Sequence, residues 1–173
     1  IEASLGIISH SHYAQQLAAT MYGESHTKNW SIVPQIITPY SLKQKENLRE
    51  KLGLKKEDCL VCTVGHIGHT KCCKELFQAW QKTKVHKEKK TKLIFLGQLE
   101  KSTYCNELIS LVQYAENADD VIFTGYISYE ELQEYLDTAD IVVQLRTFSR
   151  GETSRAVLSA MAQGKATLIN ANG

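Results

Sequence analysis

From residue 59 to residue 170, short apolar segments alternate with segments that have the spacing of amphipathic helices. Five apolar segments have lengths typical of strands: Cys59–Gly65, Leu93–Gly97, Val121–Gly125, Ile141–Leu145 and Ala166–Asn170. Strands that are apolar on both faces and alternate with helices indicate a parallel sheet covered on both sides. Because crossovers between parallel strands are right-handed, the pattern predicts a doubly wound, Rossmann-like α/β domain with helices on both faces.

The intervening segments predict the helices. The first two have apolar positions at Leu76, Phe77 and Trp80, and at Leu108, Leu111 and Val112, and the later two are expected at Glu130–Leu136 and Glu152–Gln163. Ahead of residue 59 we expect an extended run at Leu5–Ser9, a helix at His12–Tyr22 ended by Gly23, an extended segment at Ser31–Ile37 and a helix at Ser41–Leu52. The Lys-rich run 82–92 is typical of a solvated turn.

The composition fits a soluble globular domain of ordinary size. Of 173 residues, 43% are hydrophobic and 23% are charged, and no apolar run approaches the ~20 residues of a membrane helix. The net charge of +1 predicts no nucleic-acid partner, so any anion binding must come from a local cluster. Five cysteines, an odd number, favour reduced thiols and the cytoplasm.

Doubly wound folds bind ligands outside the carboxyl ends of their strands. Four loops leave those ends and are expected to line one crevice: Gly65–Lys71, Gly97–Leu99, Gly125–Ile127 and Arg146–Ser154. In the third loop, Tyr126 and Ile127 are candidates for supporting a flat base, and they are equally ordinary loop residues that cover the sheet. Asp140, just before the fourth strand, is expected to be a structural carboxylate.

The segment Arg146–Arg155 is the strongest candidate for a phosphate site. Gly151 allows close approach of the backbone, and a helix that begins near Glu152 offers unpaired amides and the positive end of its dipole. The side chains that can reach a phosphate are those of Arg146, Arg150, Thr153 and Ser154. The alternative is structural, because Ser149 and Glu152 have the spacing of a capping box.

The loop Gly65–Lys71 offers a second cation. Its two glycines permit close backbone approach, and Lys71 is placed to neutralise a pyrophosphate, although a simple turn is the default interpretation. The rival is a zinc site formed by Cys59, Cys62, His66 and His69. Only three residues separate its two pairs, against ~12 in finger-type sites, and the cysteines fall on opposite faces of a strand. We therefore expect no metal.

Several short motifs match a known family in their order and spacing. They are Val64-Gly65-His66-(x4)-Lys71, Leu96-Gly97, Phe123-Thr124-Gly125-Tyr126-Ile127-Ser128 with Glu131-Leu132, Ala139-Asp140-Ile141-Val142-Val143, and Ala160-Met161-Ala162-Gln163-Gly164-Lys165. Together they resemble the C-terminal, donor-binding domain of glycosyltransferases with two Rossmann domains (the GT-B fold), in retaining family 4, the glycosyl transferases group 1. The resemblance runs from about Ser4 to Gly173.

This sequence departs from the family pattern at three positions. The arginine of the first motif is His66 here, which carries charge only part of the time near neutral pH. The family's paired glutamates, eight residues apart, align with Gly151 and Ser159, and Glu152 lies one place later than the first of them. A variant branch with R-G-E-T-S at this point would fit the sequence. The departure puts the usual ribose contact of the second glutamate in doubt.

The resemblance implies transfer of a sugar, with retention, from a UDP- or GDP-sugar to a glycan or lipid-linked acceptor, by a hexosyltransferase-type enzyme. It implies Lys71 and Glu152 as catalytic residues. It places the donor phosphates on His66, Lys71, Arg150, Gly151, Thr153 and Ser154, and the base and ribose on Gly97, Gly125, Tyr126, Ile127 and Ser159. No metal or other cofactor is expected, since basic residues and a helix end stabilise the leaving diphosphate.

The two ends of the chain suggest a domain cut from a longer protein. We expect residues 1–24 to be the end of a preceding N-terminal domain or linker, and residues 25–173 to be the C-terminal nucleotide-sugar-binding domain, truncated at its C-terminal end. The acceptor site would lie in the missing domain, so the isolated chain should be inactive. The family's usual setting, synthesis of bacterial surface polysaccharide or glycolipid, implies a cytoplasmic protein and leaves peripheral membrane association of the full-length protein open.

Three alternatives use the same architecture. A non-catalytic nucleotide-binding or scaffold domain is credible because the paired glutamates are lost, and fold alone does not fix function. A nucleotide-sugar epimerase or a glycogen-type phosphorylase domain is a second possibility, although an epimerase demands more acid–base groups than the loops offer. A dinucleotide dehydrogenase is disfavoured because its glycine fingerprint and acidic residue do not occur together.

Overall fold

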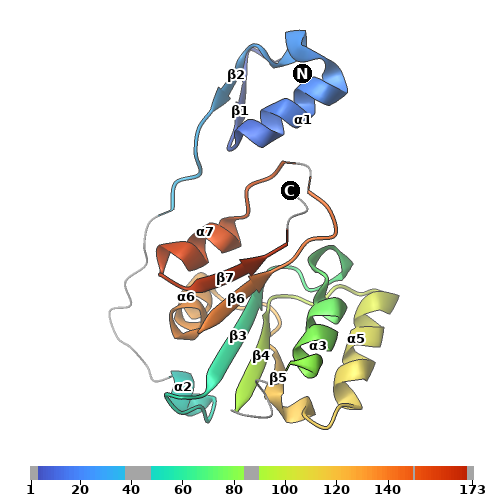
Figure 1. Cartoon of the computed structure of the whole chain (residues 1–173), viewed down its shortest axis with the longest axis vertical. Coiled ribbons are helices and arrows are strands. Elements are labelled where there is room, and N and C mark those ends of the chain that lie inside the picture. The colour runs from blue at the N-terminus through green and yellow to red at the C-terminus, as the bar shows by residue number, and fades with distance from the viewer. Residues whose placement is uncertain (1–3, 38–47, 84–89, 150, 171–173) are drawn as a thin grey trace.

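The computed structural model describes residues 4–37, 48–83, 90–149 and 151–170, and Figure 1 shows their arrangement. The larger unit is a five-stranded sheet of β3 (Cys59–Val64), β4 (Thr91–Leu96), β5 (Val121–Phe123), β6 (Ile141–Gln144) and β7 (Ala166–Ile169). All neighbouring strands are parallel, in the order β5-β4-β3-β6-β7. The Rossmann-like α/β fold expected from the sequence is confirmed.

The chain builds this sheet outward in two directions from β3. It adds β4 and β5 on one side and then returns to add β6 and β7 on the other side. The connection after β3 leads to a helix on one face, and the connection after β6 leads to a helix on the opposite face. The loops that leave the neighbouring strands β3 and β6 therefore diverge. The place between them is called the switch point of the sheet, and it is where such folds bind ligands.

Helices cover both faces of the sheet. Figure 1 shows α3 (Cys73–Lys82) and α5 (Thr103–Gln113) on one side, and α6 (Tyr129–Thr138) and α7 (Arg155–Ala162) on the other. The short elements are α2 (Leu48–Lys51) and the 3-10 helices η2 (His69–Lys71) and η3 (Ala118–Asp120). The sequence-based helix at 41–52 is described only from residue 48 onward, and residues 84–89 of the Lys-rich run lie outside the described residues.

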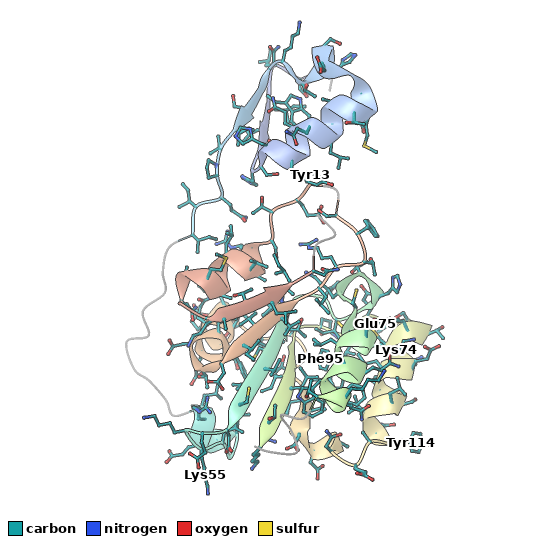
Figure 2. All side chains as sticks on the ribbon, in the orientation of Figure 1. Tyr13, Lys55, Lys74, Glu75, Phe95 and Tyr114 are labelled. Carbon is teal, nitrogen blue, oxygen red and sulfur yellow. The ribbon has the colours of Figure 1, made fainter. Side chains whose placement is uncertain are left out.

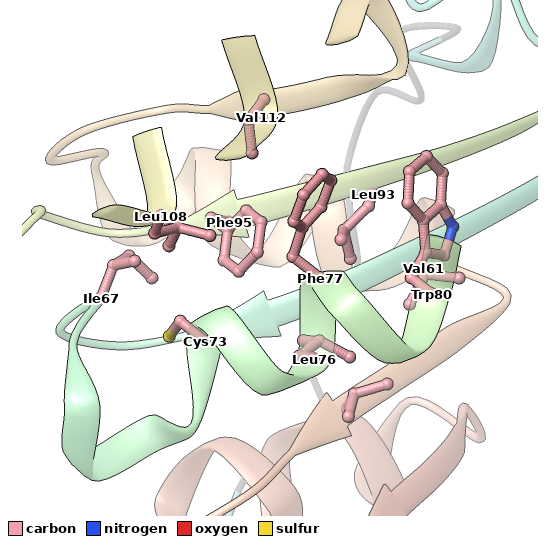
Figure 3. Packing of buried hydrophobic residues seen from close by; sticks show 11 residues of the cluster. Val61, Ile67, Cys73, Leu76, Phe77, Trp80, Leu93, Phe95, Leu108 and Val112 are labelled. Atoms are coloured by element: carbon pink, nitrogen blue, oxygen red, sulfur yellow. The ribbon is translucent and has the colours of Figure 1, made fainter. Parts of the chain in front are cut away.

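Two apolar clusters hold the layers together. The cluster beneath α3 and α5 contains Phe77 and Phe95, both fully buried, and Figure 3 shows them interleaved with the other members. Phe95 also stacks on Phe123 with ring centroids 4.9 Å apart. The second cluster packs Leu136 of α6 and Ala160 of α7 against the opposite face. Each large apolar side chain buried in this way contributes roughly 1.5–3 kcal/mol.

Strand β3 shows how alternate residues supply the two clusters. Cys59 and Val61 pack in the first cluster, whereas Leu60 and Cys62 pack in the second. The prediction that Cys59 and Cys62 face opposite sides of the strand is confirmed. Burial raises the pKa of the Cys62 thiol far above its usual range, as expected for a structural cysteine.

Asp140 is the structural carboxylate that the sequence predicted. Its Oδ2 accepts the amide hydrogen of Leu60 at 2.7 Å and pairs with Nη1 of Arg49 at 3.0 Å. These contacts tie the start of β6 to the start of β3 and to α2. The residue therefore fixes the end of the sheet that lies away from the carboxyl edge.

The amino-terminal residues form a smaller unit. Strand β1 (Ile7–Ser9) pairs in parallel with β2 (Trp30–Ile32), and α1 (His12–Tyr22) and η1 (Glu24–Thr27) connect them. Ser11 caps α1, and Gly23, at φ 90°, ends it as predicted. The expected domain boundary after residue 24 falls between these two paired strands, and Figure 1 shows the unit beside the loop between β6 and α7.

Candidate functional site

The loops that leave the carboxyl ends of β3, β4, β5 and β6 are joined by hydrogen bonds. The amide of Gly65 donates to Leu96 O at 2.9 Å, and that of Gly97 donates to Oγ1 of Thr124 at 3.2 Å. On the other side of the switch point, the amide of Thr147 donates to Thr70 O at 3.2 Å. The four loops gather at one edge of the sheet, as the topology predicts. Of the four, only the loop after β6 lines the pocket described below, so a single crevice lined by all four stays a prediction.

Gly97 makes this gathering possible. It has φ 141°, and a Cβ atom at this position would lie 2.1 Å from the carbonyl oxygen of Gly65. No side chain fits at that distance, so the β3 and β4 loops can approach each other only with glycine here. The approach brings the predicted base loop next to the predicted phosphate loop.

Lys71 lies directly at the switch point. Its Nζ is 3.5 Å from Oε1 of Gln144, and Nε2 of Gln144 donates to Val64 O at 3.1 Å. Burial lowers the pKa of Lys71, and the positive charge of Arg146 nearby lowers it further, while the Glu152 carboxylate partly opposes this effect. Two cations held close together at a half-buried position favour an anionic ligand.

A pocket of about 270 Å³ adjoins Lys71 through Gln144. The residues that line it come from β6, its following loop, α7, the end of β7 and α1: Ser11, Tyr13, Gln144, Arg146, Ser149, Gly151, Glu152, Thr153, Ser154, Val157, Leu158, Ile169 and Asn170. Four of the predicted site residues, Gly151 to Ser154, therefore share one pocket. Arg150, also predicted, lies outside the described residues.

The start of α7 differs from the sequence-based expectation. The helix begins at Arg155 rather than near Glu152, and Ser154 is its cap, with Oγ accepting the Val157 amide at 3.4 Å. Gly151 has φ 87°, a left-handed conformation that a right-handed helix does not tolerate, so the helix cannot extend back to it. The amides of residues 155 and 156 lie in the first turn, where an amide has no partner within the helix, and residues 151–154 form the approach to it.

The proposed capping box of Ser149 and Glu152 is likewise not a helix cap. Ser149 Oγ accepts the Gly151 amide at 3.1 Å and lies 3.4 Å from the Glu152 carboxylate, so the pair closes a turn within the loop. Glu152 Oε1 pairs with Nη1 of Arg146 at 2.5 Å. Glu152 therefore presents to the pocket a carboxylate whose orientation is set by an arginine.

Gly151 is also where the two units meet. Ser11 Oγ donates to Gly151 O at 3.1 Å, and a Cβ on Gly151 would lie 2.6 Å from Cα of Ala14. The backbone of the loop thus packs directly on the first turn of α1. As a result, Ser11 and Tyr13 form one wall of the pocket.

The other predicted site residues lie farther along the edge. Gly125 has φ 69°, Tyr126 is 86% exposed, and Ile127 packs partly on the second cluster. His66 is exposed at the tip of the β3 loop. Ser159 lines a separate small pocket, with Tyr129, Gln133 and Arg155 among its neighbours. A ribose contact by Ser159 stays a prediction.

Sequence reasoning missed three contributors to the site. Gln144 could have been found, because it is a polar residue in an otherwise apolar strand and is only 4% exposed. Ser11 and Tyr13 carry no such signal, since they reach the pocket from a unit about 140 residues away in the chain. Only the packing of α1 on the Gly151 loop reveals them.

The parallel sheet, its glycine-bounded loops and the pocket at its carboxyl edge define the class of protein. This is a Rossmann-like domain of the GT-B architecture found in glycosyltransferases. Over residues 44–173 the sequence matches the family described as glycosyl transferases group 1. The chain belongs to this family.

Three solved structures with a similar fold are distant from this chain in sequence. Sucrose-phosphate synthase from Thermosynechococcus elongatus is 20% identical with a TM-score of 0.78, and the match covers 99% of this chain and 42% of that one. HepE from Anabaena, solved with UDP and glucose, is 18% identical with a TM-score of 0.78, covering 97% and 45%. Starch synthase IV from Arabidopsis thaliana, bound to ADP and acarbose, is 18% identical with a TM-score of 0.72, covering 98% and 40%.

The chain therefore spans less than half the length of these three neighbours. No curated protein matches the sequence. Among the described residues, every helix is too short or too polar to cross a membrane.

Proposed function

We propose that this chain is the donor-binding half of a retaining glycosyltransferase of family 4, which transfers a hexose from a UDP- or GDP-sugar to a glycan or lipid-linked acceptor. The observation that carries the proposal is a pocket at the switch point that Arg146 and the start of α7 line, with Lys71 next to it in contact with Gln144 of the pocket wall. The chemistry of that grouping suits a diphosphate. Two solved neighbours of similar fold support the same ligand class: HepE was solved with UDP and glucose and with UDP-glucose, and starch synthase IV was solved with ADP and acarbose.

In this proposal the diphosphate lies between the β3 loop and the start of α7. Lys71 and the first-turn amides of α7, those of residues 155 and 156, would then stabilise the negative charge that grows on the leaving group as the bond to the sugar breaks. Thr153 and Ser154 add hydroxyl groups, and His66 adds a ring nitrogen on the β3 loop. Because these groups compensate the negative charge of the leaving diphosphate, we infer that the reaction needs no metal or other cofactor.

The Glu152 carboxylate is placed to orient the sugar. Its pairing with Arg146 holds it at the pocket wall. An ionised carboxylate only accepts hydrogen bonds, which matches the hydroxyl groups of a hexose.

The base and ribose would extend over the Gly97 and Gly125 loops, where Tyr126 and Ile127 offer a surface to a flat ring. We place the acceptor site in the other half of the full-length enzyme, acting in the cytoplasm.

Calorimetry on the full-length protein tests this proposal. We expect micromolar binding of UDP or GDP that is lost in Lys71→Ala and weakened in Glu152→Ala, with unchanged melting temperatures. Lys74→Ala is the matched control, because this nearby lysine pairs with Glu107 on the outer surface of α3 and α5. Tight NAD binding, or no nucleotide binding by the wild-type protein, would reject the transferase and favour a scaffold domain.

A further inference from the structure

The parts of the site follow the order of the strands along the carboxyl edge. The loops after β5 and β4, with Gly125 and Gly97, come first, and Lys71 and Gln144 follow at the junction of β3 and β6. The pocket continues past this junction to Ile169 and Asn170 at the end of β7 and to the first turn of α1. The pocket thus extends beyond the phosphate-binding groups on the side away from the base loops.

This order assigns each part of a nucleotide sugar to a place. With the base over β5 and β4 and the diphosphate at Lys71, what remains is the sugar, which must enter the pocket beside β6 and β7. The pocket volume of about 270 Å³ lies below the ~300–1,000 Å³ of sites that enclose a whole drug-sized ligand. It therefore fits one part of the donor rather than all of it.

We propose that Tyr13 contacts the transferred sugar and is a specificity-determining residue of this enzyme; the proposal rests on the function proposed above. Tyr13 lines the pocket from α1 and is 47% exposed. Figure 2 shows it at the amino end of α1, on the side turned toward the β6–α7 loop. Within the described part of the chain its hydroxyl has no hydrogen-bond partner, so both the ring and the hydroxyl are available to a ligand.

The position of Tyr13 is fixed relative to the loop that contains Gly151 and Glu152. Ser11 accepts the Ala14 amide at 3.1 Å as the cap of α1 and donates from the same Oγ to Gly151 O at 3.1 Å. Ala14, the residue after Tyr13 in the sequence, packs with its backbone on that of Gly151. These two contacts set the distance between the tyrosine ring and Glu152, which faces the same pocket.

An aromatic ring and a carboxylate that line the same pocket make a suitable pair for a pyranose. The ring packs on the apolar C–H face of the sugar, and the carboxylate accepts from hydroxyl groups. Hexoses that differ in the orientation of one hydroxyl group differ in both contacts. The pair would therefore discriminate among donors that carry the same nucleotide.

The test compares each nucleotide sugar with its own diphosphate. Calorimetry on the full-length protein measures affinities for UDP, GDP, UDP-glucose, UDP-galactose and GDP-mannose. In Tyr13→Ala we expect the affinity for the preferred nucleotide sugar to fall about five- to tenfold while that for the diphosphate stays unchanged. Tyr22→Ala is the matched control, since Tyr22 is on the same helix, is 57% exposed and does not line the pocket.

The outcomes separate this inference from the proposed function. If the wild-type protein binds neither diphosphate, the transferase itself is rejected and the role of Tyr13 falls with it. If the diphosphate binds but Tyr13→Ala leaves the affinity for every nucleotide sugar unchanged, only the role of Tyr13 is overturned. If the melting temperature of Tyr13→Ala drops, Tyr13→Leu replaces it, because leucine keeps apolar bulk at the same position. The same comparison applies to it: the affinity for the nucleotide sugar should fall while that for the diphosphate stays unchanged.

Discussion

Lys71 illustrates how one residue acquires a function from its surroundings. In the sequence it is one of many lysines, and only its place after a glycine-rich turn distinguishes it. In the structure it is half-buried, contacts an amide fixed by β3, and shares its environment with Arg146. Burial and the neighbouring cation both disfavour the positive charge of Lys71. A bound anion would stabilise that charge, so the site favours an anionic ligand.

A pH dependence of ligand binding follows from this environment. Because the pKa of Lys71 is lowered, the cation is present at low pH and is lost as pH rises through that lowered value, earlier than for an ordinary lysine. UDP or GDP affinity should therefore fall over that range, and binding should take up a proton, since a bound diphosphate raises the pKa again. Calorimetry in buffers of different ionisation enthalpy measures this uptake.

Lys71→Arg is the control for that experiment, because an arginine stays protonated throughout the accessible range. Its affinity should remain flat over the pH interval in which the wild-type affinity falls. Equal pH profiles for the two proteins would show that Lys71 does not titrate in the site.

At the scale of elements, α7 shows how a local turn sets a helix start. The Ser149–Glu152 spacing is that of a capping box, but the left-handed backbone at Gly151 interrupts the helix and moves its start to Arg155.

Ser154→Ala should then destabilise the protein by about 1 kcal/mol, the usual cost of losing a cap. Urea denaturation measures this loss, and a larger loss in Ser149→Ala than in Ser154→Ala would contradict the observed start.

The elements themselves could be read from the sequence to a large extent. Apolar runs gave the five strands because a strand buried on both faces has almost no other possible composition. The gathering of four loops followed from topology alone. The start of α7 could not be predicted, because serine–glutamate spacing is the same in a cap and in a closed turn. The wall formed by Ser11 and Tyr13 depends on packing between distant segments, which local patterns do not encode.

At the scale of the whole molecule, the chain corresponds to less than half of its structural neighbours. Over residues 4–37, its smaller unit has two strands, with Leu5 and Ile8 exposed. We expect the isolated 173-residue chain to bind donor weakly and to transfer no sugar, because one half of a two-domain active site does not hold an acceptor. A radiolabelled transfer assay that compares the isolated chain with the full-length protein checks this, and turnover by the isolated chain would contradict it.

The contact between Gly151 and Ala14 also limits how this sequence can diverge. At 2.6 Å from Cα of Ala14, a Cβ on residue 151 has no room, and a larger side chain on residue 14 would press on the same backbone. Neither position can change alone without moving α1 away from the pocket. Across sequences that descend from this one, the two positions should therefore covary, and that statistical coupling would mark the junction in family members whose structures have not been determined.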